Sequence, residues 1–309
     1  MCRVEELNRQ AARWRSGADK GANKKGTLAA LIEHYKGAPE FRNLADKTRK
    51  DYSRYLEMLA ERFGDLKVAT MPREFVFALR DRYADTPRTA NYVISVLRRL
   101  MNFAVDRGWR TDNPVLRPRL LKTGPGHKIW TAEAEEKFRA VAPPEMVLAM
   151  DLAIYTGQRE GDILRMTWQQ YDGTTVEVVQ SKTKAKVWIP IHRDLKARLD
   201  ALTKSSIFIL TTRTGRPFKA DHFRHQWRKA ILDAGLDGHT FHGLRHTAAD
   251  RLAEAGCSDR EIMAITGHRT HAMVSRYLQG ADQKNKARAA ITKLERRRQP
   301  RAERGDGDL

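Results

Sequence analysis

The 309-residue chain has almost no cysteine, since Cys2 and Cys257 are its only two. Two thiols cannot build a disulfide framework or a cysteine-rich zinc site, and they are compatible with a reducing compartment. No stretch approaches the roughly 18 consecutive apolar residues of a membrane span, and the charged first residues lack the apolar region of a secretory signal. We therefore expect a cytoplasmic protein with no membrane partner.

Acidic residues are also scarce relative to basic ones. The chain has 38 Asp and Glu against 58 Lys and Arg, which gives a formal net charge of +20. A field of this sign attracts polyanions and accelerates encounter with them. The sequence lacks a basic amphipathic segment with an aromatic-rich apolar face, which disfavours binding to a membrane surface. The charge balance therefore indicates nucleic acid as the partner.

The pattern of apolar, glycine and proline residues predicts two domains with flanking segments. The length fits two domains of roughly 100–200 residues each. We expect a polar lead-in, a four-helix DNA-binding module, a basic linker with four Lys or Arg and no acid after Asn113, a second domain and a basic tail. These segments comprise residues 1–26, 27–112, 113–128, 129–281 and 282–309.

The first domain reads as helices only, and the second as helices with a small antiparallel sheet. Helical spacing with glycine stops predicts helices at 28–35, 46–63, 72–83, 86–107, 146–155, 159–166, 193–202, 219–234, 242–255, 258–266 and 273–279. Asp46 and Thr131 are predicted helix caps. Alternation predicts a hairpin of strands 174–179 and 187–191, with 206–210 as a third strand. The predicted fold is mainly α with a small antiparallel β-sheet.

A few polar residues occupy positions that indicate a binding or catalytic site. His242 and Arg245 are three apart at the start of a predicted helix, so they share a face at an end that attracts anions. His239, His242 and His246 could be taken for metal ligands, but their spacing is loose and Arg245 would place a fixed cation beside the metal. We therefore predict an anion site and no metal.

Five motifs in order resemble the tyrosine recombinases of the phage-integrase type. They are Thr156-Gly157-Gln158-Arg159-Glu160-Gly161-Asp162-Ile163-Leu164, Ser181-Lys182-Thr183, His242-x-x-Arg245, Gly267-His268 and Tyr277. The resemblance covers residues 130–280, and the first domain matches the family's core-binding domain at the level of pattern. It implies a helical core-binding domain followed by a mixed α/β catalytic domain. The implied catalytic residues are Arg159, Lys182, His242, Arg245, His268 and Tyr277.

The resemblance also implies a role for each of these residues. Two arginines suit a phosphodiester because each gives permanently charged, bidentate contact to phosphate, and His268 can add a third donor. Tyr277 would be the nucleophile, although full ionisation of a phenol at pH 7 costs about 4 kcal/mol. His242 would manage its proton.

Lys182 would protonate the departing 5′ oxygen, with Lys184 and Lys186 as the nearby rivals. Asp162 is expected to orient a group of the site rather than react. Thr266 stands where the family often has leucine, and we expect that difference to change packing and not chemistry.

The implied function is that of an integrase. It would cleave and rejoin double-stranded DNA at specific recombination sites through a 3′-phosphotyrosine, with no cofactor, as a homo-tetramer assembled on DNA. It would thereby integrate or excise a phage or other mobile element, with possible accessory DNA-bending factors. A Xer-like resolvase and a transposon recombinase have the same chemistry. A non-cleaving DNA-binding protein on the same fold and a type IB topoisomerase remain alternatives.

Overall fold

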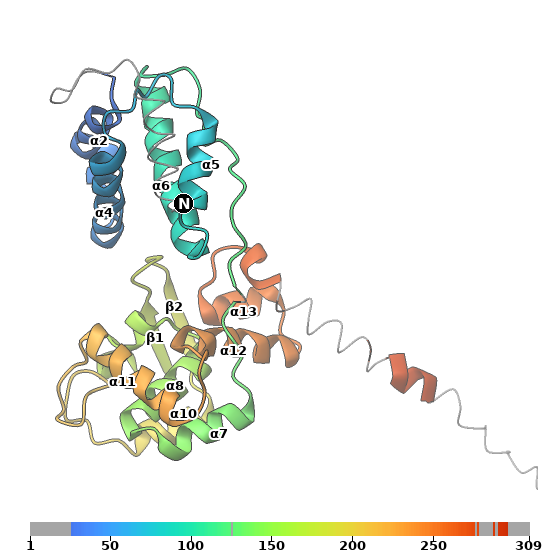
Figure 1. Cartoon of the computed structure of the whole chain (residues 1–309). Coiled ribbons are helices and arrows are strands. Elements are labelled where there is room, and N and C mark those ends of the chain that lie inside the picture. Colours follow the sequence, from blue (N-terminus) through green and yellow to red (C-terminus); the bar gives the residue numbers. More distant parts are fainter. Residues whose placement is uncertain (1–25, 125, 276, 278–286, 288–289, 296–309) are drawn as a thin grey trace, which may run out of the picture. The chain divides into compact units, whose positions relative to one another are not determined.

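The computed structural model divides the chain into two compact units, Met1–Gly124 and Pro125–Leu309 (Figure 1). It describes residues 26–124, 126–275, 277, 287 and 290–295. Most of the predicted lead-in and tail therefore lies outside the described residues. Within the described residues, no helix combines the length and the apolar character needed to cross a bilayer.

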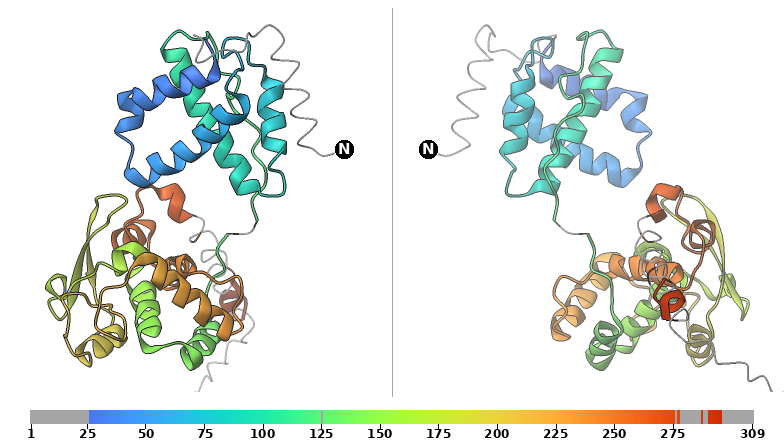
Figure 2. Two further views of the ribbon diagram at one scale, coloured as in Figure 1. Left: turned by 60° about the vertical axis from the view of Figure 1, so that its left-hand side comes forward. Right: turned by 90° about the vertical axis from the view of Figure 1, so that its right-hand side faces the viewer.

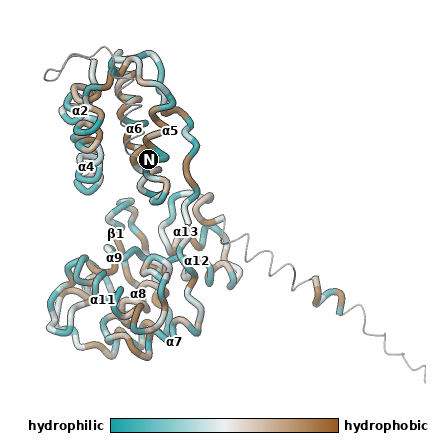
Figure 3. The backbone as a smooth tube through the Cα atoms, in the orientation of Figure 1, coloured by the Kyte–Doolittle hydropathy of each residue, from teal (hydrophilic) through white to brown (hydrophobic). Residues whose placement is uncertain are grey.

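Unit 1 is a group of helices around one apolar core, seen from two further sides in Figure 2. Its helices are α2 (Leu28–Gly37), α3 (Pro39–Arg42), α4 (Asp46–Phe63), α5 (Arg73–Asp81) and α6 (Pro87–Asp106). The longest, α6, alternates hydrophobic and hydrophilic residues along its length, as a helix with one buried face must (Figure 3). Asp46 is the first residue of α4 and not its cap, because Ala45 takes the cap position without a side-chain hydrogen bond.

The first part of the basic segment after Asn113 lies along the surface of unit 1. Arg73 donates from Nη1 to the carbonyl oxygens of Pro114 and Leu116 at 3.1 and 2.9 Å. Asn91 exchanges two hydrogen bonds of 2.9 Å with the backbone of Leu121. These bonds satisfy backbone groups of a segment that lacks secondary structure of its own, so they fix its path along α5 and α6.

Unit 2 is built around the apolar helix α8 (Pro144–Thr156), which is buried on nearly every face. Its other elements are α7 (Ala132–Val141), α9 (Glu160–Ile163), η1 (Trp168–Gln170), β1 (Thr175–Val179), β2 (Lys186–Pro190), α10 (Arg193–Asp200), α11 (Ala220–Asp233), α12 (Phe241–Glu254) and α13 (Asp259–Thr266). Helix α8 packs against α12, α10, α9 and α11. The Thr131 hydroxyl accepts from Ala134 N at the start of α7, so this predicted cap is confirmed. Residues 271–275 and Tyr277 are also helical.

The sheet has two strands, with β1 and β2 antiparallel and Val176 opposite Ile189. Val176, Val178, Val187 and Ile189 point into the core, while Trp188 lies on the exposed face, as strand alternation requires. The predicted third strand at 206–210 is wrong. Phe208 forms only an isolated bridge with Thr167, because this segment pairs with the loop before η1 and not with β1 or β2.

Candidate active site

The six predicted catalytic residues come from five separate places in unit 2. Arg159 occupies the N-cap position of α9, two residues after the left-handed Gly157 that ends α8. Lys182 lies in the turn of the β1–β2 hairpin. His242 and Arg245 stand in the first turns of α12, His268 follows α13, and Tyr277 lies beyond it.

Arg245 is the most enclosed of the six, with 2% of its surface exposed. Its Nη1 donates to the carbonyl oxygens of Gly157 at 2.7 Å and Thr266 at 2.6 Å, so it joins the ends of α8 and α13. Desolvation, followed by the charge of Arg159, lowers its pKa to about 10, and it stays charged at pH 7. Its buried Nη2 has no hydrogen-bond partner among the described residues. A buried guanidinium with an unused donor is suited to an anionic ligand.

Arg159 is held by Gln180, a residue that sequence reasoning missed. Gln180 is fully buried. Its Oε1 accepts from Arg159 Nη1 and from Thr183 Oγ1, both at 2.8 Å. Its Nε2 donates to Gln158 Oε1 at 2.7 Å and to the Thr266 carbonyl at 2.8 Å. Every hydrogen-bonding position of this amide is used, so it fixes one guanidinium relative to the hairpin turn and the end of α13.

A sequence signal for Gln180 was available. The buried face of β1 carries Val176 and Val178, and the next residue on that face is Gln180. A polar residue that continues a buried apolar face needs hydrogen-bond partners, because burying an amide without them costs free energy.

We predict that Gly267→Ala destabilises the protein more than Gly235→Ala. Both glycines follow a helix at nearly the same left-handed φ, +68° and +66°. An alanine in that conformation costs roughly 1–2 kcal/mol of stability, and this cost is common to both variants. A Cβ at Gly267 would lie 2.4 Å from Gln180 Nε2, whereas no described atom lies within 4 Å of one at Gly235. Displacing Gln180 breaks buried hydrogen bonds, which adds about 1–3 kcal/mol.

Urea unfolding of the two variants measures the difference between them. Equal losses of unfolding free energy would show that the Gln180 contacts contribute nothing to stability.

The hairpin turn that carries Lys182 is fixed on both sides of the lysine. Asp162, which is 4% exposed, accepts at Oδ1 from Ser181 N at 2.9 Å and Ser181 Oγ at 2.8 Å. Thr183 is bonded to Gln180 on the other side. The Lys182 side chain is exposed between these two anchors. Asp162 therefore orients the turn, in agreement with the positioning role expected for it.

His242 lies within the electrostatic reach of three of the other predicted residues. Its pKa is lowered from 6.5 to about 4, first by desolvation of the ring and then by nearby positive charge. The groups that supply the charge are His127, Arg245, Arg159 and Lys182. At pH 7 the imidazole is therefore neutral, and the field around it attracts anions.

Three imidazoles, those of His127, His242 and His246, gather at the start of α12. One nitrogen from each lies within 4.8 Å of the others, and the His127 ring stacks on that of His246 with centroids 5.3 Å apart. His239, considered from sequence, instead packs against Trp130. Imidazole nitrogens can bind zinc-like metals, but the cations around His242 oppose a divalent ion there. The charges favour phosphate as the ligand of this region.

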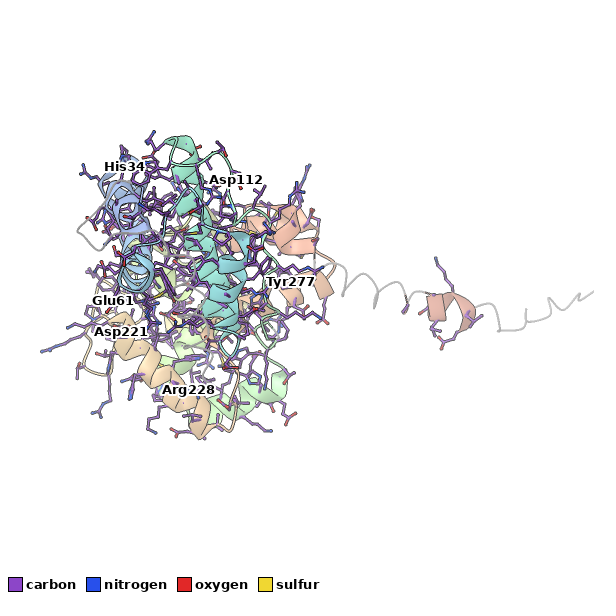
Figure 4. The ribbon with its side chains drawn as sticks, turned by 45° about the horizontal axis from the view of Figure 1, so that its top comes forward. His34, Glu61, Asp112, Asp221, Arg228 and Tyr277 are labelled. Carbon is purple, nitrogen blue, oxygen red and sulfur yellow. The ribbon has the colours of Figure 1, made fainter. Side chains whose placement is uncertain are left out.

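Tyr277 is buried against α12 and α13, in a small cluster that includes Ala253, Ile262 and Val274. Only 5% of its surface is exposed, and Figure 4 labels it in the C-terminal part of unit 2. Its hydroxyl pairs with Nδ1 of His246, and its charged form would raise the pKa of Arg245. The phenol therefore lies within electrostatic reach of the buried arginine.

His268 is oriented by Thr266, which corrects the expectation that this threonine affects packing alone. The Thr266 hydroxyl donates to the Ile262 carbonyl at 2.6 Å and lies 2.7 Å from His268 Nδ1. Because that hydroxyl has only one hydrogen, Nδ1 of His268 must be the donor in the second bond. The threonine therefore sets which nitrogen of His268 carries the proton, a choice that a leucine could not make.

Comparisons with known proteins match the part of the chain that carries these residues. The model of the Phage integrase family matches residues 132–284. The integrase of Escherichia phage HK022 is 29% identical over 269 residues, which cover 81% of this chain and 75% of that protein. A lambda integrase dimer bound to a COC′ core site superposes with a TM-score of 0.73 at 25% identity, covering 89% of this chain and 85% of the other. A lambda integrase tetramer bound to a Holliday junction gives 0.71 at 25% identity, covering 87% of each chain.

Proposed function

Because the chain belongs to the phage integrase family and is a site-specific tyrosine recombinase, we propose that it integrates or excises a mobile DNA element with Tyr277 as its nucleophile. The observation that carries this proposal is the neighbourhood of α12. There a buried phenol lies within electrostatic reach of the buried guanidinium of Arg245, whose Nη2 lacks a hydrogen-bond partner among the described residues. Arg159 and Lys182 add further positive charge around His242.

The first half-reaction exchanges one phosphate ester for another. The Tyr277 oxygen forms a bond to phosphorus, and the bond from phosphorus to the 5′ oxygen breaks. Arg159 and Arg245, with His268, stabilise the charge that accumulates on the non-bridging oxygens. Lys182 gives a proton to the departing 5′ oxygen. The phenol proton passes to an imidazole of α12, for which His242 is the residue predicted from sequence.

The second half-reaction is the reverse with a different strand. The 3′-phosphotyrosine keeps the energy of the broken ester, so a 5′-hydroxyl from a partner duplex can attack it and reseal the strand. This exchange needs four active sites for two duplexes. The proposal therefore includes a homo-tetramer on DNA, in line with the tetramer of lambda integrase on a Holliday junction.

DNA binding is proposed for both parts of the chain. Unit 1 exposes the basic side chains Lys47, Lys50, Arg54, Arg88, Arg98 and Arg99, which can pair with phosphates and position the duplex without reading sequence. We assign residues 27–112 to a core-binding domain and 129–281 to the catalytic domain. The protein would act in the cytoplasm, with accessory DNA-bending factors as further partners.

We predict that the protein captures DNA covalently. A library of nicked duplexes with a randomised core, in which the short 5′ fragment diffuses away after cleavage, should yield adducts that survive SDS and contain one enriched site. Phosphotyrosine at the 3′ end is the expected linkage, identified by mass spectrometry of the peptide. Enriched binding without an adduct would favour a non-cleaving DNA-binding protein. Adducts without an enriched site, together with plasmid relaxation, would favour a topoisomerase.

A further inference from the structure

Two histidines of α12 can compete for the phenol proton, and they lie one helical turn apart. His242 and His246 are four residues apart, so they lie on one face of the helix, and their ring centroids are 5.1 Å apart. The resemblance to known recombinases assigns the proton to the first of them. The contacts of Tyr277 indicate the second, because its hydroxyl pairs with Nδ1 of His246.

We propose that His246 is a catalytic residue, the base that accepts the proton of Tyr277 during strand cleavage. This inference rests on the proposed function, in which Tyr277 is the nucleophile. As the phenol oxygen bonds to phosphorus, its proton moves to Nδ1 of His246. During resealing, the same nitrogen returns the proton to the departing phenol oxygen. His242 remains beside the arginines and contacts the phosphate.

Three contacts hold the ring of His246 in the orientation this role needs. The ring stacks on His127 with an interplanar angle of 27°. It meets His242 edge-on at 89° and lies 5.7 Å from the Tyr277 ring. In this role Nδ1 accepts from the phenol, which requires the neutral ring of His246 to carry its proton at Nε2.

His127, near the start of unit 2, is also tied to α12. His127 is exposed, and its Nδ1 lies 2.8 Å from the hydroxyl of Thr240, the cap of α12. Its ring is therefore anchored to the same helix that carries His242 and His246. A residue 119 positions before His246 in sequence thus helps to orient the proposed base.

The contact can be tested without DNA, with 3-fluorotyrosine placed at position 277. We expect His246→Ala to move the fluorine resonance of the free protein, because it removes the hydrogen-bond partner of the phenol. His242→Ala should move it much less, and His225→Ala, an exposed histidine of α11, should not move it. The assignment would be overturned if His246→Ala left the fluorine chemical shift unchanged, or if His242→Ala changed it equally.

The proton transfer is tested by single-turnover cleavage of the captured duplex. Loss of a general base typically costs about 10²–10⁴-fold in rate, and we expect His246→Ala and His246→Asn to fall in that range. More heavily fluorinated tyrosines at position 277, whose phenols are more acidic, should restore most of the rate to His246→Ala. They should do little for Lys182→Ala, which a sulfur in place of the 5′ oxygen should rescue instead.

Two outcomes would reject the base. One is wild-type cleavage by His246→Asn, which keeps a hydrogen-bonding side chain but cannot take the proton. The other is an equal response of His246→Ala and wild-type protein to fluorination. If wild-type protein forms no adduct with any duplex, the proposed function fails, and the fluorine resonance then still reports whether His246 holds the phenol.

Discussion

Tyr277→Phe is expected to lower the rate of covalent adduct formation by about 10⁴-fold or more, to below detection, while DNA affinity stays within about twofold. The substitution removes one oxygen and keeps the ring, which packs against Ala253, Ile262 and Val274. The hydroxyl of Tyr277 is the only group lost, so the fold of unit 2 should persist. Adduct formation on the nicked duplex is followed on denaturing gels, and affinity by mobility shift.

The matched control is Tyr171→Phe in the same unit. Tyr171 is also largely buried, and its hydroxyl donates to the Gly173 carbonyl at 3.1 Å. This variant loses a buried, hydrogen-bonded hydroxyl, as Tyr277→Phe does. Tyr171, however, lies in the loop before β1 and is not one of the predicted catalytic residues. Its cleavage rate should equal that of the wild type. Adducts formed by Tyr277→Phe would remove Tyr277 from the role of nucleophile.

The fold could be predicted from sequence wherever a single residue type determines where a helix or strand ends. Gly157 and Gly267 end α8 and α13 in left-handed conformations, and these stops were visible in the sequence. The hairpin followed from alternation in β1 and β2. The third strand at 206–210 could not be excluded from sequence, because an apolar run does not reveal whether its neighbour is a strand or a loop.

Most residues of the candidate site could be predicted from sequence only where they belong to a recognisable motif. Arg159, Arg245 and Tyr277 were found because their local sequence resembles a known pattern. Gln180 continues the buried face of β1, which indicates that it needs partners but does not identify them. His127 belongs to no motif, and the partners of both residues lie far along the chain. Gln180 reaches the Thr266 carbonyl, and His127 reaches Thr240. The identity of these partners depends on tertiary packing, which spacing and composition do not reveal.

Arg245→Ala is expected to slow cleavage by about 10³-fold, which corresponds to roughly 4 kcal/mol of transition-state stabilisation. One preorganised donor is typically worth about 10²–10³-fold, and this guanidinium is both buried and permanently charged. Arg245→Lys keeps the charge but loses the planar, two-pronged contact, so it should recover only part of the rate. DNA affinity should weaken less than tenfold in both variants, because most of the phosphate contacts that we propose come from exposed basic residues elsewhere.

Arg245 also supports the fold through Gly157 and Thr266, so a loss of stability must be separated from a loss of chemistry. Arg251→Ala provides the separation. Arg251 lies six residues further along α12 and pairs with Glu135, so its loss also removes an arginine contact that joins α12 to the rest of unit 2. We expect that variant to unfold at lower urea and to cleave at the wild-type rate. If Arg245→Ala weakened binding and cleavage by the same factor, Arg245 would be a phosphate anchor, and its buried Nη2 would have no part in the transition state.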